Sequence, residues 1–388
     1  MSFYRETLDD LRAKSLLREL RTLDAVDGAL VRYGDCTLVN FASNDYLGLS
    51  QHPEVRTAAK EAIDSYGVGA GASRLITGSL RTHERCEAAL AAFKGTEAAL
   101  LFGSGYAAAV GTIGSLVGRG DVVILDKLAH ASLIDGARLS GAIIRIFPHN
   151  NLKRLEEQLI WADERYPTSR HLVITESVFS MDGDRCDLNQ LVALKRQHGA
   201  FLLLDEAHST GVIGSSGRGL TALLGLEQEV DVQMGTLSKA LGVVGGFIAG
   251  SKDLIDLLTN RARSFIYSTA PPPAIAAAVE TAIRILGSDE GKILINKLWA
   301  NIHSILRQLP DQFSSKSEPS SAIIPLMVGD EKVALDLAEK LLAEGFLIPA
   351  IRFPTVARSS ARLRLAVSAA QTEEQIERLV HSLAKVKA

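Results

Sequence analysis

The chain has 388 residues, of which 47% are hydrophobic and 22% are charged, and its net charge is −3. These values are ordinary for a globular enzyme with two or three folding units, and the lack of a long basic run disfavours nucleic acid as a partner. Three cysteines without metal-ligand spacing favour a reduced, cytoplasmic location. The first residues show no basic segment followed by an apolar one, so no secretory signal is expected.

The first 25 residues predict an amphipathic arm, because Leu8, Leu11, Leu16 and Leu20 recur at helical spacing among charged residues. Residues 37–41 then predict a short strand. Together these segments form the arm that we assign to the first 48 residues.

From about residue 50 to 270, short runs of Val, Ile and Leu alternate with helical segments. The predicted strands are 98–102, 121–125, 142–146, 171–175, 201–205, 231–235 and 245–249. Continuous apolar strands separated by helices are typical of a mostly parallel sheet buried on both faces. The expected fold class is therefore α/β, with a seven-stranded, mostly parallel sheet covered by helices.

One stretch of this region, residues 98–118, carries no charge and has about the length of a membrane-spanning helix. Glycines and serines interrupt its apolar surface, which favours a strand, a turn and a buried helix over a membrane span.

The remainder of the chain predicts a smaller α+β domain. The expected elements are helices 272–286 and 290–309, strand 322–328, helix 331–344, strands 347–351 and 362–367, and a helix from 371. We therefore divide the chain into an arm (1–48), a large cofactor-binding domain (49–286) and a small C-terminal domain (287–388).

Asp205 and Lys239 are the residues that point most directly to chemistry. Asp205 ends the apolar strand 201–205, at the edge where open α/β sheets place ligands. Lys239 follows the next predicted strand. Pyridoxal phosphate needs an amine to hold its aldehyde and a carboxylate to keep its ring nitrogen protonated. The two residues could supply these groups.

A turn between a predicted strand and a predicted helix contains Gly103, Ser104, Gly105 and Tyr106. Its backbone N–H groups could bind a phosphate at the start of the helix, although a tight turn alone would also require glycine. The turn lacks the third glycine and the acidic ribose ligand of a dinucleotide fingerprint. A dinucleotide oxidoreductase is therefore disfavoured.

Three further polar residues, His130, Ser180 and His208, follow predicted strands at the same edge. His130 could stack on a flat ring or lie in a surface loop. A hydrolase triad built on Asp205 and His208 is disfavoured, because no Gly-x-Ser-x-Gly elbow exists.

Two acidic residues near Ser180 are also open to more than one interpretation. Glu176 and Asp182 could hold a metal, but turn capping is the better interpretation of Asp182, and no metal site is predicted.

Arginines near the end of the chain offer planar clamps for carboxylates. They are Arg352, followed by Thr355, and the pair Arg362 and Arg364. The pair points to one side of a strand, so one arginine could serve the site while the other is only solvated.

The chain resembles the α-oxoamine synthases over nearly its whole length. These enzymes use pyridoxal phosphate to condense an amino acid with an acyl-CoA. Five sequence stretches, which include several of the residues named above, carry this resemblance. The stretches are residues 41–49 (FASNDYLGL), 177–184 (SVFSMDGD), 205–211 (DEAHSTG), 351–356 (IRFPTV) and 362–364 (RLR). Members of the family usually have Pro-Pro after the first arginine, whereas this chain has Phe353-Pro354, so its acyl-end contacts could differ.

The resemblance implies a fold-type I transferase and roles for individual residues. It implies that Lys239 holds the cofactor and then acts as acid and base, that Asp205 pairs with the ring nitrogen, and that His130 stacks on the ring. The cofactor contacts it implies are Gly105, Tyr106, His130, Ser180, Asp205, His208, Thr236, Lys239 and, from a neighbouring subunit, Thr269. The substrate contacts it implies are Arg21, Asn44, Arg352, Thr355 and Arg364.

Within the family, the same stretches are most similar to the branch that serves biotin synthesis. The resemblance thus implies a homodimer that condenses L-alanine with pimeloyl-CoA and releases CoA and CO₂. A sister enzyme such as glycine C-acetyltransferase is the nearest alternative. A non-catalytic binding protein on the same fold would not need Lys239.

Overall fold

The protein is described by a computed structural model that covers residues 2–14, 16–313 and 320–386. Its centre is a seven-stranded sheet with the order β4-β10-β9-β8-β7-β5-β6. The strands are β4 (Ala98–Phe102), β5 (Val122–Asp126), β6 (Ile143–Phe147), β7 (His171–Glu176), β8 (Phe201–Asp205), β9 (Val232–Thr236) and β10 (Gly246–Gly250). Only β10 runs antiparallel to its neighbours. The mostly parallel sheet expected from the sequence is confirmed, with strand ends shifted by at most one residue.

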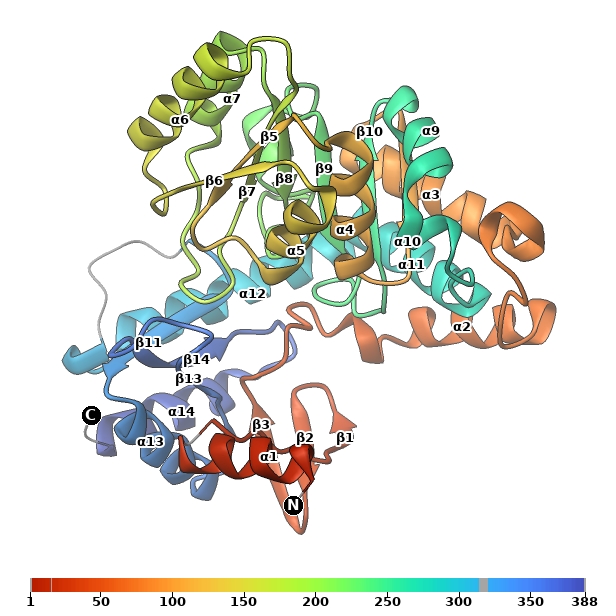
Figure 1. Cartoon of the computed structure of the whole chain (residues 1–388). Helices are drawn as coiled ribbons and strands as arrows, with labels where there is room; N and C mark the ends of the chain where they lie inside the picture. Colours follow the sequence, from red (N-terminus) through yellow and green to blue (C-terminus); the bar gives the residue numbers. More distant parts are fainter. Residues whose placement is uncertain (1, 15, 314–319, 387–388) are drawn as a thin grey trace.

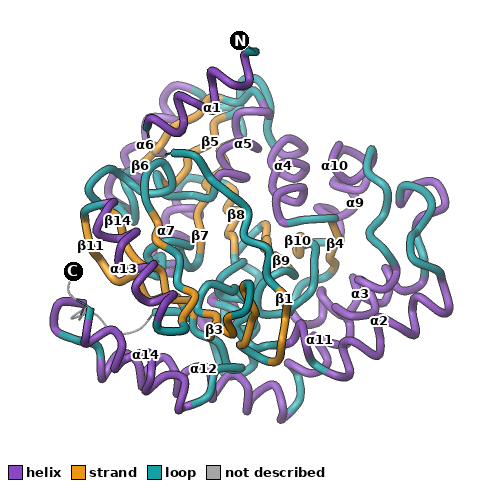
Figure 2. The backbone as a smooth tube through the Cα atoms, turned by 90° about the horizontal axis from the view of Figure 1, so that it is seen from below, coloured by secondary structure: helices purple, strands orange, loops and turns teal. Residues whose placement is uncertain are grey.

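Helices cover both faces of this sheet (Figure 1). One face carries α4 (Gly105–Leu116), α5 (Ala131–Ser140), α9 (Lys252–Arg261) and α10 (Arg263–Ile266). The other carries α3 (Arg81–Lys94), α6 (Leu152–Arg165), α7 (Leu188–Gln197) and α11 (Pro273–Leu286), with α2 (Pro53–Tyr66) packed on α11. Leu203 packs in one core and its neighbours Leu202 and Leu204 in the other, because successive strand side chains point to opposite faces. Figure 2 shows the helices surrounding the strands.

The uncharged stretch 98–118 forms β4, a turn and α4, as expected. Leu101 and Ile113 are fully buried within it. Within the described ranges, no helix is both long enough and apolar enough to cross a bilayer.

The two ends of the chain come together below the central sheet (Figure 1). A four-stranded sheet there has the order β1 (Asp24–Asp27), β2 (Leu30–Tyr33), β3 (Cys36–Asn40) and β12 (Phe346–Leu347). β1, β2 and β3 pair antiparallel, and β12 pairs in parallel with β3. Beside it lie β11 (Ile323–Gly329), β14 (Ala361–Ala366) and β13 (Ala350–Ile351). The remaining helices there are α12 (Asp289–Gln308), α13 (Glu331–Ala343) and α14 (Glu373–Lys385).

Two expectations for these ends were wrong. The arm helix α1 spans only Phe3–Ala13, so Leu16 and Leu20 lie beyond it, and Leu20 is fully exposed. No residue of α1 is buried, so packing does not extend the helix beyond its short periodic segment. Residues 347–351 were expected to form a single strand, but they contribute to two strands in different sheets. β12 pairs with β3, whereas β13 pairs with β14.

Candidate active site

The strand-end residues meet at one edge of the central sheet because β4, β5, β7, β8 and β9 all run in the same direction. Glu176 at the end of β7 pairs with Asp205 at the end of β8, and Asp205 pairs with Met234 on β9. The loop after β9 then carries Lys239. The sheet register therefore brings together the carboxylate and the amine that the sequence singled out.

A chain of hydrogen bonds leads from Lys239 to the C-terminal part of the protein. Lys239 Nζ lies 2.7 Å from His208 Nε2, and His208 Nδ1 lies 2.7 Å from the Tyr46 hydroxyl. Tyr46 donates to Asn44 Oδ1 at 3.1 Å, and both terminal nitrogens of Arg364 donate to the same oxygen at 3.3 Å. If Tyr46 donates to Asn44, His208 carries its proton on Nδ1 and accepts from Lys239 on Nε2.

Burial and like charge lower the pKa of the basic groups in this chain of hydrogen bonds. Burial lowers the pKa of His208 well below its usual value, and the nearby charges of Lys239 and Arg364 lower it further. Burial also lowers the pKa of Lys239, to about 8, although Asp205 and Glu176 oppose the shift. Lys239 is thus a base that can gain and lose a proton near neutral pH.

The two carboxyl groups beside Lys239 are both buried. Burial raises the pKa of Asp205, while the charge of Lys239 and the N–H of Ala207, which donates to Asp205 Oδ1 at 2.9 Å, lower it. Burial and the neighbouring charge of Asp205 raise the pKa of Glu176 well above its usual value. A carboxylate in such surroundings gains from a cationic partner.

The phosphate-type turn lies against the end of β9. A Cβ placed on Gly105 would lie 3.4 Å from Thr236 Cβ, and one on Gly246 would lie 2.5 Å from the carbonyl oxygen of Ser104. Ser104 caps α4 by accepting from Ala107 N at 3.0 Å. Glycine is therefore required at position 246, where the backbone of the turn approaches β10 closely, and the first N–H groups of α4 lie at a helix start on this edge of the sheet.

The Thr236 hydroxyl is already engaged within the loop that follows β9. It donates to the carbonyl of Gly245 at 2.9 Å and lies 2.8 Å from the Ser238 hydroxyl. These contacts place two hydroxyl groups beside the start of α4.

His130 is the N-cap of α5, and a hydrogen bond to Glu176, the last residue of β7, holds its backbone in place. Its backbone N–H donates to Glu176 Oε1 at 2.6 Å, and its Nδ1 lies 2.8 Å from the Ser132 hydroxyl. Burial lowers the pKa of His130, which Asp205 partly offsets. The residue is held at the strand-end edge as a neutral ring.

Arg362 and Arg364 on β14 are both buried, so the expectation that one is only solvated was wrong. Arg364 Nε donates to the carbonyl of Ser180 at 2.6 Å. Arg362 forms an ion pair with Asp182. Asp182 therefore neutralises a buried arginine, a role that its interpretation as a turn cap did not include.

Five of the sequence-derived candidates lie outside this group. Tyr106 donates its hydroxyl to Asp135 at 2.8 Å, and Thr355 Oγ1 accepts from Arg18 at 3.4 Å. Arg21 and Thr269 are exposed, and Thr269 forms a β-bridge with Ser73. The backbone carbonyl of Arg352 accepts from Thr355 N at 3.0 Å. Their roles remain predictions.

Sequence reasoning missed three groups that lie around the site. Tyr46 lies inside a stretch that had been noted, yet its contact with His208 depends on the tertiary fold. Lys94 and Glu206 form a buried ion pair directly beside Asp205. A histidine between two aspartates, His149, gave no signal beyond its place after a predicted strand.

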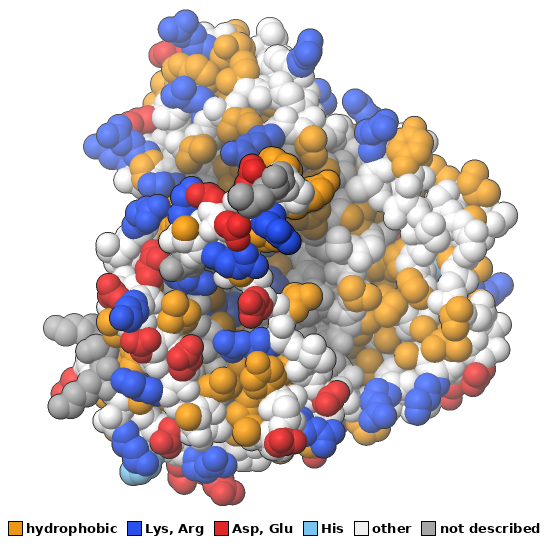
Figure 3. Space-filling model, turned by 60° about the horizontal axis from the view of Figure 1, so that its bottom comes forward, with side chains coloured by type: hydrophobic (Ala, Val, Ile, Leu, Met, Phe, Trp, Pro, Cys, Tyr) orange, Lys and Arg blue, Asp and Glu red, His pale blue; other side chains and the backbone are white. Residues whose placement is uncertain are grey.

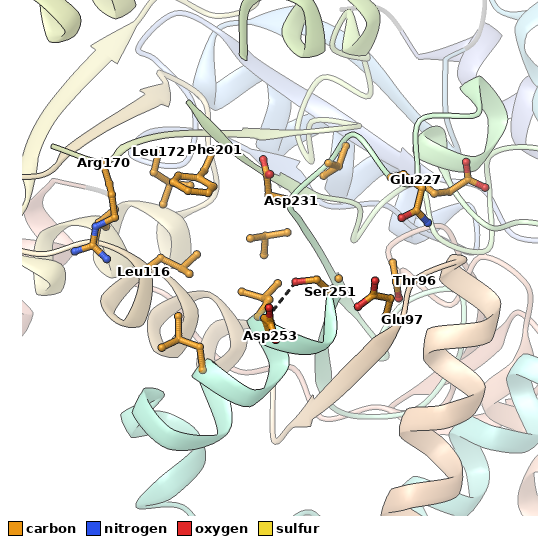
Figure 4. A pocket seen from close by; sticks show the side chains of 17 residues that line it. Thr96, Glu97, Leu116, Arg170, Leu172, Phe201, Glu227, Asp231, Ser251 and Asp253 are labelled. Carbon is orange, nitrogen blue, oxygen red and sulfur yellow. Dashed lines mark hydrogen bonds between the residues drawn. The ribbon is translucent and has the colours of Figure 1, made fainter. Parts of the chain in front are cut away.

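Figure 3 shows a hollow in the molecular surface with Lys and Arg side chains gathered along one side. Another cavity, of about 400 Å³ and drawn in Figure 4, lies at the opposite edge of the sheet, where β7, β8 and β9 begin. The described residues that line it include four carboxylates and no lysine, and two of these carboxylates, Asp231 and Glu227, are paired with Lys195 and Arg218. We therefore place the active site at the carboxyl edge.

Comparison with known proteins identifies the family. The family model for aminotransferase class I and II matches residues 37–383. The chain is 45% identical over 379 residues to the 8-amino-7-oxononanoate synthase of Geobacter sulfurreducens, which covers 98% of this chain and 96% of the relative. It is 41% identical over 386 residues to the synthase of the same name from Thermoanaerobacter pseudethanolicus, covering 100% and 97%.

Solved structures agree with these relatives. A Sphingomonas wittichii serine palmitoyltransferase superposes with a TM-score of 0.91 at 32% identity and covers 98% of this chain and 95% of that one. The 8-amino-7-oxononanoate synthase of Francisella tularensis superposes with a TM-score of 0.76 at 27% identity, covering 90% and 97%.

A mostly parallel seven-stranded sheet with a partly buried lysine and a buried carboxylate at its carboxyl edge defines a fold-type I pyridoxal phosphate enzyme. The chain belongs to the aminotransferase class I and II family and, within it, to the α-oxoamine synthases. It is a transferase whose cofactor is pyridoxal 5′-phosphate.

The residues present fit this cofactor. When bound, its protonated ring withdraws electrons from the substrate carbon and so stabilises a carbanion there. A buried carboxylate, Asp205, is available for the ring nitrogen, and the Lys239 amine for the aldehyde. The start of α4 at Gly105 and the Thr236 hydroxyl beside it are available for the phosphate.

The lowered pKa of Lys239 predicts how the apoprotein captures its cofactor. Only the neutral amine attacks an aldehyde, so the capture rate should rise with pH and level off above about 8, the pKa of Lys239. Stopped-flow absorbance of the apoprotein mixed with pyridoxal phosphate measures this rate. A midpoint near the ordinary lysine pKa of about 10.4 would contradict the assigned burial effect.

Proposed function

We propose that the protein catalyses the decarboxylative condensation of L-alanine with pimeloyl-CoA, or another pimeloyl thioester, to 8-amino-7-oxononanoate, CoA and CO₂ in biotin biosynthesis. The observation that carries the proposal is the contact of the partly buried Lys239 with His208, close to Asp205, in a chain 45% identical to a synthase of that name. Three unpaired cysteines support a reducing, cytoplasmic location.

Lys239 and Asp205 carry the proton chemistry in this proposal. Lys239 Nζ takes the proton from Cα of alanine and later returns one, which its lowered pKa favours near neutral pH. Asp205 is ionised beside the positive ring nitrogen and keeps that nitrogen protonated. His130 covers the ring, and Ser180 and His208 contact its phenolic oxygen.

Asn44 and Arg364 bind the carboxylate of alanine. Arg364 is held by the Ser180 carbonyl through Nε, which leaves its two terminal nitrogens directed to the Asn44 side chain. A carboxylate can accept both of these N–H groups in a bidentate arrangement. The chain from Arg364 through Asn44, Tyr46 and His208 to Lys239 then couples substrate binding to the base.

The acyl substrate approaches from the basic side of the hollow in Figure 3. Arg21, Arg352 and Thr355 are the residues we assign to it. A contact between the N-terminal arm and this segment supports the assignment, because Arg18 of the arm donates a hydrogen bond to Thr355. Guanidinium groups suit the distal carboxylate of a pimeloyl chain or the phosphates of CoA.

A second subunit completes the site in this proposal. Val68, Ile76 and Tyr267 are each more than 70% exposed, although they are large and apolar. They lie near the bridge between Ser73 and Thr269. Exposed apolar side chains in one region mark an interface, so we assign a homodimer in which Thr269 of the neighbouring subunit and the backbone of Gly105 and Tyr106 bind the phosphate.

One assay tests the substrates. The purified holoenzyme is mixed with L-alanine, glycine or L-serine and with pimeloyl-CoA, acetyl-CoA or palmitoyl-CoA, and release of CoA is followed. We expect alanine with pimeloyl-CoA to give kcat/KM at least about 100-fold above every other pair, because an unmatched carboxylate or chain leaves polar groups unpaired. Equimolar CO₂ must accompany CoA.

Other outcomes separate the alternatives. Preference for glycine with acetyl-CoA would show the sister enzyme glycine C-acetyltransferase. Preference for serine with palmitoyl-CoA would show the activity named for the structural neighbour. A protein that binds pyridoxal phosphate yet releases CoA with none of these pairs would overturn the proposal.

A further inference from the structure

His149 joins three strand-end loops, yet it has no role in the site described so far. It lies in the loop after β6, with Nδ1 3.0 Å from Asp126 Oδ1 and Nε2 2.9 Å from Asp184 Oδ2. Ionised carboxylates only accept hydrogen bonds, so both ring nitrogens must donate. The geometry therefore requires an imidazolium between two aspartates.

The surroundings of the ring agree with this charge. Burial lowers the pKa of His149, but the hydrogen bonds and charges of Asp126 and Asp184 outweigh it and raise the pKa to about 10. These are the charged groups that face the ring, from β5 and from the loop after β7. Phe179 contacts it edge-on with ring centroids 4.3 Å apart.

Asp126 connects His149 to the loop that carries His130. Its side chain is fully buried, and its two oxygens accept from Leu128 N at 2.8 Å and from Asn150 N at 2.9 Å. Leu128 begins the turn that leads to His130. The imidazolium neutralises the buried carboxylate on which this turn depends, which is otherwise costly to bury.

Asp184 connects His149 to the loop that carries Ser180. That loop closes on itself, because Phe179 N donates to the Asp184 carbonyl at 3.0 Å and Gly183 N donates to the Phe179 carbonyl at 2.8 Å. Ser180 lies between these bonds. A salt bridge to Asp184 therefore fixes the base of the loop.

We propose that His149, as an imidazolium, is a positioning residue that acts through Asp126 on His130 and through Asp184 on Ser180. The proposal rests on the proposed function, because there His130 and Ser180 contact the cofactor. His149 itself touches neither cofactor nor substrate. Its loss frees two loops on neighbouring strands at once.

The test is His149→Gln, in which the amide keeps much of the size but cannot carry charge. The dissociation constant of pyridoxal phosphate is measured by titrating the apoprotein and following protein fluorescence, and circular dichroism of the bound cofactor reports its orientation. We expect about ten-fold or more weaker binding, since charge-assisted hydrogen bonds are lost, and a smaller dichroic band. Wild-type affinity should also fall as pH rises through about 10, beyond what His149→Gln shows.

The matched control is His198→Gln. His198 Nδ1 pairs with Asp163 Oδ2 at 2.6 Å, and its side chain is more buried than that of His149, but it caps the outer helix α7. We expect it to lower Tm while leaving cofactor affinity and dichroism within about two-fold of wild type. Asp184→Asn, a milder change at the more exposed partner, is measured in parallel so that a poorly folded His149→Gln does not decide the test.

Each outcome is decisive. If the wild-type apoprotein does not bind pyridoxal phosphate, the proposed function fails. If the wild type binds but His149→Gln and Asp184→Asn match the His198→Gln control in affinity, dichroism and pH profile, His149 is only structural and the positioning role is overturned. Weaker binding with an altered band in both variants supports it.

Discussion

Lys239→Ala should abolish the long-wavelength absorbance of lysine-bound pyridoxal phosphate and lower kcat by about 10⁴-fold or more. The amine that holds the cofactor and the base that moves the Cα proton are the same atom, so one substitution removes two functions. The side chain is partly buried beside His208, and alanine leaves its pKa-shifting neighbours in place. Absorbance spectra and CoA release measure the two effects.

The control for this variant is Lys252→Ala, which removes an exposed lysine that pairs with Asp256 at the start of α9. Its spectrum and kcat should match the wild type, since exposed pairs contribute little. A Lys239→Ala protein with an unchanged visible spectrum, or with more than about 1% of wild-type turnover, would remove this lysine from both roles.

Lys94→Met should lower the free energy of unfolding by about 3–5 kcal/mol. Lys94 Nζ donates to Glu206 Oε2 and to the Arg218 carbonyl, both at 2.5 Å, and neither side chain of the ion pair is exposed. Burial raises the pKa of Glu206, but the charge of Lys94 and the hydrogen bonds from Lys94 and Thr221 outweigh this effect. The pKa of Glu206 is therefore lowered overall. Methionine leaves a buried carboxylate without its cation. Urea unfolding at fixed protein and cofactor concentration measures the loss.

Two comparisons sharpen this result. Adding Glu206→Gln to Lys94→Met should recover part of the stability, because the uncompensated charge is removed. Arg85→Met, which breaks the exposed pair with Glu280, should cost less than about 1 kcal/mol. If Lys94→Met costs no more than Arg85→Met, the buried pair does not support the Asp205 loop as argued.

The central sheet was predictable because its strands are local patterns. Most of these strands are apolar runs of about five residues bounded by helical segments, and such runs can be recognised without knowledge of their neighbours in the sheet. The reversal of β10 was not predictable, because direction depends on which strands it pairs with. Likewise β1 and β2, which are mostly exposed, carry no apolar pattern to mark them.

The candidate site divides in the same way. Asp205 and Lys239 were recognisable because residue type and place after a buried strand suffice to suggest their chemistry. The partners of Arg362 and Arg364 were not, since Asp182, Ser180 and Asn44 are far from β14 in sequence. The two arginines of β14 thus have different partners because different residues pack against each of them.

The sequence by itself determined which groups are available: a strand-end carboxylate, a lysine after the next parallel strand, and a glycine turn at a helix start. Local periodicity and residue chemistry decide such features. Only the tertiary structure decided their electrostatic state. Burial lowers the pKa of Lys239 and raises that of Asp205, and the charge of Lys94 offsets that of Glu206, because desolvation and charge pairing depend on which distant segments surround a group.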